Sequence, residues 1–132
     1  MNVLSVRHLI ENDFLILDVL HKTPAGPVNA NVLLFRFAGQ VYAYVNHCMH
    51  MHRPLNVQAD GIFDPERRWL RCSMHGFLFE PTTGICISPV CAGQGLKALK
   101  VAEEAGVIVF KQKYFHIRAV YSPDKQLLWE AL

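Results

Sequence analysis

The chain has 132 residues, of which 52% are hydrophobic and 18% are charged, and its formal net charge is +2. This composition is typical of a compact globular protein and excludes a disordered chain, while so weak a charge argues against a nucleic-acid partner. The length predicts a single domain over residues 1–132 that can fold without disulfides.

Membrane and export signals are not expected in this sequence. No run of apolar residues reaches the roughly eighteen that a membrane helix needs. Near the N-terminus, Glu11 and Asp13 interrupt any apolar core of a signal peptide. We therefore expect a cytoplasmic protein with no membrane contact, in which cysteines serve metal binding rather than disulfides.

The order of β-rich runs and turn signals predicts an all-β fold. The Ala38-Gly39 break between two such runs predicts a hairpin. The segment from 46 to about 68 has no clean period and predicts a long structured loop, of the kind that usually carries function. The tail over 126–132 could form a short helix or a strand. The expected strands cover 14–20, 30–37, 40–45, 69–72, 76–79, 96–101, 107–111 and 114–121, with an extended piece at 85–88.

Cysteine and histidine occur in two short pairs. Cys48-Met49-His50 lies in the long loop, and Cys72-Ser73-Met74-His75 follows after 21 residues, 51–71. Two Cys and two His can complete the coordination of a [2Fe–2S] cluster, with both Cys on one iron and both His on the other. Zinc also accepts two Cys and two His, so a structural zinc module is the alternative that these residues leave open.

The paired pattern Cys-x-His and Cys-x-x-His-Gly resembles the signature of Rieske proteins. Further likenesses extend over about 3–111: Pro54-Leu55, the stretch 76–80, the turn and proline-containing loop over 83–89, and closing strands at 96–101 and 107–110. The resemblance implies an antiparallel β-sandwich of short-stranded sheets with a two-loop cluster-binding subdomain over about 46–93. It also implies one [2Fe–2S] cluster per chain, held by Cys48, His50, Cys72 and His75. The tail over 112–132 is an extension beyond this likeness.

The type of Rieske protein can be argued from four positions. Respiratory and photosynthetic members carry a second cysteine pair, where this chain has Arg53 and Met74, and hydroxyl donors where it has Phe77 and Phe79. Fewer donors to the sulfurs predict a reduction potential near the low end of the Rieske range, about −150 mV.

The chain is therefore similar to the Rieske-type ferredoxins that feed oxygenases. The resemblance implies a one-electron carrier and not an enzyme, with a flavin-dependent NAD(P)H reductase as donor and a terminal oxygenase as acceptor. The small subunit of an assimilatory NAD(P)H nitrite reductase is the rival within the same fold. The sequence leaves the oligomeric state open.

Several residues near the two pairs have alternative interpretations. His47 or His52 could replace His50 as a ligand, although the Cys-x-His spacing favours His50. Cys86 and Cys91 are not expected to be ligands; their spacing would allow a disulfide, which the cytosol disfavours. Met49, Met51 and Met74 either pack around the cluster or form an adaptable rim for redox partners.

Two further groups of residues have simpler interpretations. The leftover histidines, His8, His21 and His116, form no second metal set, and Arg67-Arg68 is most simply a solvated turn in a loop insertion near 60–68. The apolar residues of the tail could cover a sheet edge, form a dimer contact or dock a partner; they are Leu127, Leu128, Trp129 and Leu132.

Overall fold

The computed structural model describes residues 3–5, 9, 11–46, 62–64, 66, 68–71, 77–89, 94–111 and 115–130. Within these residues the chain forms eleven strands and no α-helix, as the all-β prediction requires. None of the described elements is a helix long and apolar enough to cross a membrane. The strands are β1 (Val3–Ser5), β2 (Phe14–Thr23), β3 (Gly26–Phe37), β4 (Gln40–Val45), β5 (Leu70–Arg71), β6 (Leu78–Phe79), β7 (Ala98–Leu99), β8 (Val101–Glu104), β9 (Val107–Phe110), β10 (Phe115–Tyr121) and β11 (Leu127–Glu130).

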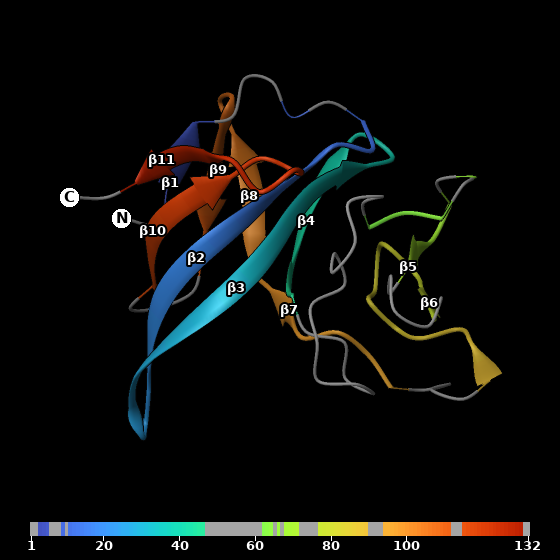
Figure 1. Ribbon diagram of the computed structural model, residues 1–132, viewed down its shortest axis with the longest axis horizontal. Coiled ribbons are helices and arrows are strands. Elements are labelled where there is room, and N and C mark those ends of the chain that lie inside the picture. The colour runs from blue at the N-terminus through green and yellow to red at the C-terminus, as the bar shows by residue number, and fades with distance from the viewer. Residues whose placement is uncertain are drawn as a thin grey trace.

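The strands form three antiparallel sheets. A six-stranded sheet has the order β11-β10-β2-β3-β4-β7, a three-stranded sheet has the order β1-β9-β8, and β5 pairs with β6. In Figure 1 the long ribbons of β2 and β3 cross the middle of the molecule, with β5 and β6 to their right. The expected strand over 96–101 is divided at Lys100, because β7 joins the six-stranded sheet and β8 joins the three-stranded one.

The core lies on both faces of the six-stranded sheet. In β3, Leu33 and Phe35 join one apolar cluster with Leu70 and Phe79 of the β5–β6 hairpin. The alternate residues of β3 join a second cluster, which contains Ile108 of the three-stranded sheet and has Val32 and Leu34 as its β3 members. A strand buried on both faces has a continuous apolar run rather than an alternating one, and Val32–Phe35 are all fully buried.

The hairpin between β2 and β3 is longer than the sequence pattern indicated. Pairing continues to Thr23 and Gly26 around the turn at 24–25, through polar residues that do not read as strand. Pro27 is tolerated in this strand because β4 pairs with β3 only from Val32 onward, leaving the far end of β3 with a single neighbour. The sequence pattern did not predict this end of the hairpin, because its residues have no apolar alternation and are strands only through their pairing with one another.

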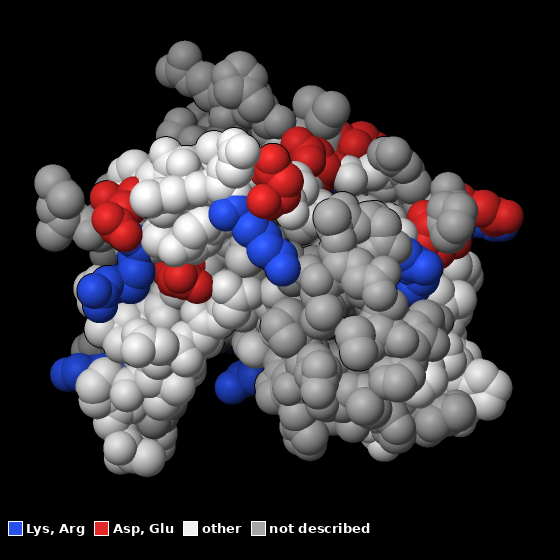
Figure 2. Space-filling model, viewed as in Figure 1, with Lys and Arg blue, Asp and Glu red and all other residues white. Residues whose placement is uncertain are grey.

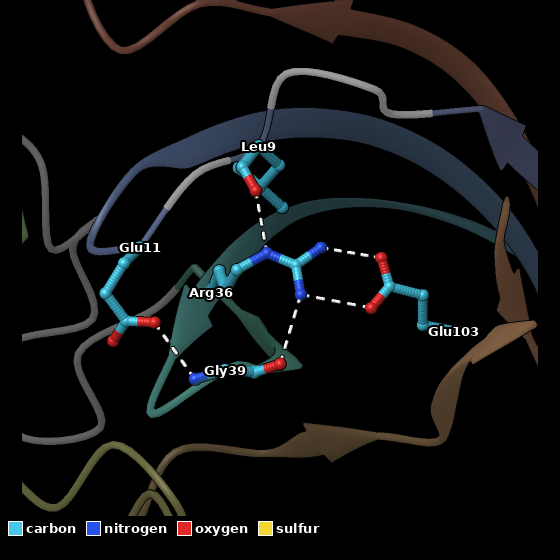
Figure 3. Close-up of polar contacts among 5 residues, drawn as sticks. All are labelled: Leu9, Glu11, Arg36, Gly39 and Glu103. Carbon is cyan, nitrogen blue, oxygen red and sulfur yellow. Dashed lines mark hydrogen bonds and ion pairs between the residues drawn. The ribbon is translucent and has the colours of Figure 1, made fainter. Parts of the chain in front are cut away.

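A half-buried arginine joins three parts of the fold (Figure 3). Arg36 of β3 donates from Nε to the Leu9 carbonyl oxygen at 2.7 Å and from Nη1 to the Gly39 carbonyl oxygen at 3.2 Å. Its two Nη atoms also donate to the Glu103 carboxylate of β8 at 3.0 and 2.6 Å. Glu11 accepts from the Gly39 backbone N–H at 2.9 Å. The N-terminal segment, the β3–β4 turn and the three-stranded sheet are thus connected at one guanidinium.

The tail forms two strands that widen the six-stranded sheet. β10 pairs with β2 and buries Phe115, Ile117 and Val120, so it covers what would otherwise be a sheet edge. β11 then pairs with β10, which makes the expected helix-or-strand segment a strand. Leu127 and Leu128 on this outer strand are about half exposed.

Charged side chains on the face shown in Figure 2 lie in small mixed groups. Acidic and basic residues are neighbours there, and the described residues on this face form no broad patch of one sign. This distribution agrees with the formal net charge of +2.

Candidate metal centre

The four predicted ligands, Cys48, His50, Cys72 and His75, lie outside the described residues. The same holds for neighbouring residues that the sequence singled out, namely His47, Met49, Met51, His52, Arg53, Pro54, Leu55, Arg67, Met74, Leu132 and Cys91. The structure does describe the strands from which the two ligand segments leave. Those strands carry the geometric argument.

The first ligand segment follows directly on β4. Tyr44 of β4 is 2% exposed, and its hydroxyl donates to the Pro81 carbonyl oxygen at 2.6 Å. Its ring also lies over Gly84, where an added Cβ would come within 2.8 Å of the ring. Burial raises the pKa of the Tyr44 hydroxyl well above its usual range, so the group stays protonated as a donor. The end of β4 is thereby fixed against the turn that follows β6.

The second ligand segment lies between the strands of a short hairpin. β5 and β6 pair with Leu70 opposite Phe79 and Arg71 opposite Leu78. The intervening chain, which includes Cys72 and His75, therefore starts and ends on neighbouring strands. Antiparallel pairing at the base of a loop restricts the positions that its ends can take.

A third segment is attached to the same hairpin. The Leu78 backbone N–H donates to Ser88 Oγ at 2.9 Å, and the Ile87 N–H donates to the Leu78 carbonyl oxygen at 2.9 Å. The Cys86 N–H donates in turn to the Gln94 carbonyl oxygen at 2.7 Å. The turn and proline-containing loop that the resemblance implies over 83–89 thus lies beside β6.

One apolar cluster contains the bases of all three segments. Tyr44, Leu70, Phe79 and Leu96 are buried in it together. The strands that flank the two Cys–His pairs therefore belong to a single packed unit, as a centre shared between two loops requires. Among the described residues, no group of three or more His, Cys, Asp or Glu could hold a metal ion elsewhere.

The two phenylalanines on which the low-potential prediction rests lie at the β5–β6 hairpin. Phe79 is 1% exposed inside the cluster, and Phe77 is half-buried against it. Neither side chain can donate a hydrogen bond to a sulfur.

Cys86 differs in part from its expected state. It is buried, at 3% exposure, as predicted. It is also disulfide-bonded, although the sequence argument disfavoured a disulfide at this residue. The chain has four cysteines, and the other three, Cys48, Cys72 and Cys91, lie outside the described residues.

Sequence reasoning missed a polar row that ends beside the first ligand segment. Asp18, Asn31 and Asn46 lie side by side across β2, β3 and the end of β4, joined by hydrogen bonds. A sequence signal existed, because Asp18 and Asn31 interrupt otherwise apolar strands. Only the sheet register shows that they are neighbours.

Comparison with known proteins identifies related folds. The family model for the Rieske [2Fe–2S] domain matches residues 2–100. Among solved structures, the chain is similar to the ferredoxin of carbazole 1,9a-dioxygenase from Nocardioides aromaticivorans IC177, at 21% identity and a TM-score of 0.59, covering 86% of this chain and 97% of that one. It is also similar to a Sphingomonas yanoikuyae B1 ferredoxin, at 20% identity and a TM-score of 0.58, covering 85% and 97%.

Two further matches come from complexes of oxygenase and ferredoxin. A chain in the complex of reduced oxygenase and oxidized ferredoxin of carbazole 1,9a-dioxygenase is 20% identical, with a TM-score of 0.59 and coverage of 97% of this chain and 96% of that one. In a fluorene-bound complex of the same system, the chain matches 28% of a longer chain at 18% identity and a TM-score of 0.63. No curated protein matches significantly.

Proposed function

The chain belongs to the Rieske [2Fe–2S] domain family, and from this membership we propose that it works as a ferredoxin, a one-electron carrier. Its donor is a flavin-dependent NAD(P)H reductase, and its acceptor is the terminal component of an oxygenase system. The observation that carries the proposal is the family match over residues 2–100, which includes both Cys–His pairs. The cofactor that this family implies is one [2Fe–2S] cluster.

We assign the cluster ligands as Cys48 and Cys72 on one iron and His50 and His75 on the other. Two thiolates and two imidazoles are the donor set of a Rieske cluster. The packing of β4 against the β5–β6 hairpin supports this set, because it holds the bases of both ligand segments in one apolar unit. When bound, the cluster supplies a site that takes up and releases one electron.

The described residues contribute a rigid and apolar support. Phe79 of the hairpin is 1% exposed and Tyr44 fixes the end of β4, so neither base can move without breaking packed contacts. A constant geometry suits a carrier, because electron transfer needs little rearrangement of the protein. Electron-transfer encounters also need only small interfaces, which exposed loop tips can provide.

The comparison with whole chains favours a separate carrier over a catalytic subunit. The match covers 97% and 96% of two chains, one a ferredoxin and one from an oxygenase–ferredoxin complex, against 28% of a longer chain in another such complex. The oxygenase–ferredoxin complexes support a terminal oxygenase as the partner by analogy of fold. The cytoplasmic location expected from the sequence remains a prediction.

Electron paramagnetic resonance of the dithionite-reduced protein tests the proposal, together with iron, zinc and sulfide analysis. We expect two irons and two sulfides per chain and the anisotropic signal of a Rieske cluster. His50→Ala should abolish the signal, while the matched control His52→Ala should keep it. A colourless protein with zinc and no sulfide would refute the carrier function and favour the zinc module.

The choice of acceptor needs a second measurement. Reduced protein is mixed with a terminal oxygenase or with a sirohaem nitrite reductase subunit, and reoxidation is followed in the visible spectrum. Rapid reoxidation by the oxygenase alone supports the proposal. Reoxidation by the nitrite reductase subunit alone would assign the chain to the rival system.

A further inference from the structure

The polar row across β2, β3 and the end of β4 begins where the apolar row beside it stops. Ile16 and Leu33 are opposite one another in the sheet and are buried under the hairpin side of the core. Two residues further along, Asp18 and Asn31 are opposite one another on the same face, and Asn46 follows β4 beside Asn31. The row therefore lies at the boundary between the apolar cluster and a more open part of the sheet.

Three hydrogen bonds of ordinary length join the residues of this row. The Asn46 backbone N–H donates to the Asn31 carbonyl oxygen at 2.8 Å, and Asn46 Nδ2 donates to Asn31 Oδ1 at 2.7 Å. Asn31 Nδ2 then donates to Asp18 Oδ1 at 2.9 Å. Asn31 thus uses both ends of its amide, one toward Asn46 and the other toward Asp18.

Apart from Tyr44 with its hydroxyl, Asn46 is the one buried residue with a polar or charged side chain among the described residues, at 6% exposure. A buried amide is costly unless its hydrogen bonds are made, so the position of Asn46 is set by the bonds that Asn31 offers. Both the main chain and the side chain of Asn46 are bonded to the same residue. The last described residue before the first ligand segment is therefore fixed in position and in orientation.

The opposite end of the row is open. Asp18 lines a groove with Asn29, Arg118 and Glu130. The phenol of Tyr121 faces the Asp18 carboxylate, whose negative charge raises the pKa of that phenol. The only charged member of the row thus lies at the end where its charge can be hydrated, and the buried end carries neutral amides alone.

We propose that Asn31 and Asn46 are positioning residues for the first ligand pair, holding the chain that presents Cys48 and His50. This inference rests on the ligand assignment proposed above. Asn46 precedes Cys48 by two residues, so a rotation at Asn46 is transmitted to the ligands by the main chain. Asp18 completes the row by holding the Asn31 amide in the orientation that accepts from Asn46.

The experiment compares Asn31→Leu with the matched control Asn29→Leu in the cluster-loaded protein. Asn29 lies two residues earlier on β3, is exposed and lines the same groove, but makes no hydrogen bond to Asn46. We measure the loss of visible absorbance under an iron chelator, the resonance g values and the midpoint potential. Asn31→Leu removes the bond to Asp18 as well as the bond from Asn46. It should lose its cluster at least about fivefold faster, the factor expected for the one bond that reaches Asn46, with shifted g values. Asn29→Leu should match the wild type.

Two further variants keep the test decisive if Asn31→Leu folds poorly. Asn46→Ser removes the buried amide without adding an apolar side chain, and it should reproduce the faster cluster loss. Asp18→Asn keeps an oxygen acceptor for Asn31 but removes the negative charge, and its rate of cluster loss should match the wild type. If Asp18 acted only through its charge, this rate would change. Equal loss rates and g values in Asn31→Leu, Asn46→Ser and Asn29→Leu would overturn the inference. A wild-type protein without a Rieske signal would instead overturn the proposed function.

Discussion

Replacing Tyr44 with Phe tests how strongly the end of β4 is held. The ring would keep its place beside Phe35, with which it now stacks at 5.8 Å between centroids, and above Gly84. Only the hydroxyl is lost, and with it the 2.6 Å bond to the Pro81 carbonyl oxygen. Because Pro81 is buried, that oxygen would remain without its donor.

The expected cost of Tyr44→Phe follows from this bond. A hydrogen bond contributes about 1 kcal/mol, and leaving a buried acceptor unpaired adds to this, so we expect about 1.5 kcal/mol. The unfolding entropy of 132 residues is about 0.28 kcal/mol/K at typical values per residue. The midpoint of thermal unfolding should therefore fall by about 5 °C.

The assay is thermal unfolding by circular dichroism of wild type and variant at equal cluster content. Tyr42→Phe is the matched control, since Tyr42 lies on the same strand and stacks on Phe35 at 5.8 Å, while its hydroxyl makes no hydrogen bond within the described residues. That control should stay within about 0.5 kcal/mol of wild type. Equal midpoints for the two variants would refute the role given to the Tyr44 hydroxyl.

The pH dependence gives the same prediction an independent check. Burial raises the pKa of Tyr44 above the ordinary value of 10.0. The stability that Tyr44 contributes is therefore present below pH 10 and is lost as the pH rises toward the raised pKa, because the unfolded chain releases the proton first. Wild type and Tyr44→Phe should accordingly converge in stability above about pH 10.

Three other outcomes are expected. Gly84→Ala should lower the free energy of unfolding in urea by about 2 kcal/mol or more, because Gly84 has φ +76° and a Cβ would meet the Tyr44 ring. The control Gly39→Ala, at φ +80° with open space, should lower it by only about 1 kcal/mol, and equal losses would contradict the packing argument. Glu103→Gln should cost under about 1 kcal/mol at neutral pH. The hydrogen bond from Arg36 lowers the pKa of Glu103, so this difference should disappear as the pH falls through the lowered pKa; a difference that persists in acid would point to another cause. Redox titration should give a midpoint potential of about −150 mV, which decreases as the pH rises once the ligand histidines of the oxidised cluster lose protons. A midpoint potential well above zero, or one that is constant up to about pH 10, would contradict this prediction.

Most strands could be predicted from the sequence because their apolar residues occupy the buried positions. Val32–Phe35 is continuous since both faces are covered, and β10 alternates at Phe115 and Ile117 because only one face is buried. The far end of the β2–β3 hairpin was missed for the opposite reason. Its residues are mostly polar, glycine or proline and show no apolar alternation, so only the pairing of β2 with β3 makes them a strand.

The candidate site also has a part that the sequence predicts and a part that it does not. The chemistry and spacing of the Cys and His side chains predict a metal centre, so the four ligands could be proposed from the sequence. The hydrogen bonds proposed to position the first pair could not be predicted, because Asn31 and Asn46 are 15 residues apart and become neighbours only through the register of β3 with β4. Likewise Tyr44 and Pro81 are separated by 37 residues, and no local pattern connects them.

The long segment between the two ligand pairs has little effect on where its ends lie. Tyr44 and Asn46 at β4 hold the chain that leads into the first pair, and the pairing of β5 with β6 holds the chain that leads into the second. Lengthening a loop between fixed ends costs only a logarithmic term in chain entropy, about 0.6 kcal/mol for each doubling. The 21 residues that separate the two Cys–His pairs are therefore compatible with the proposed centre, because the strands that lead into the two pairs pack in one apolar cluster whatever the length of chain between the pairs.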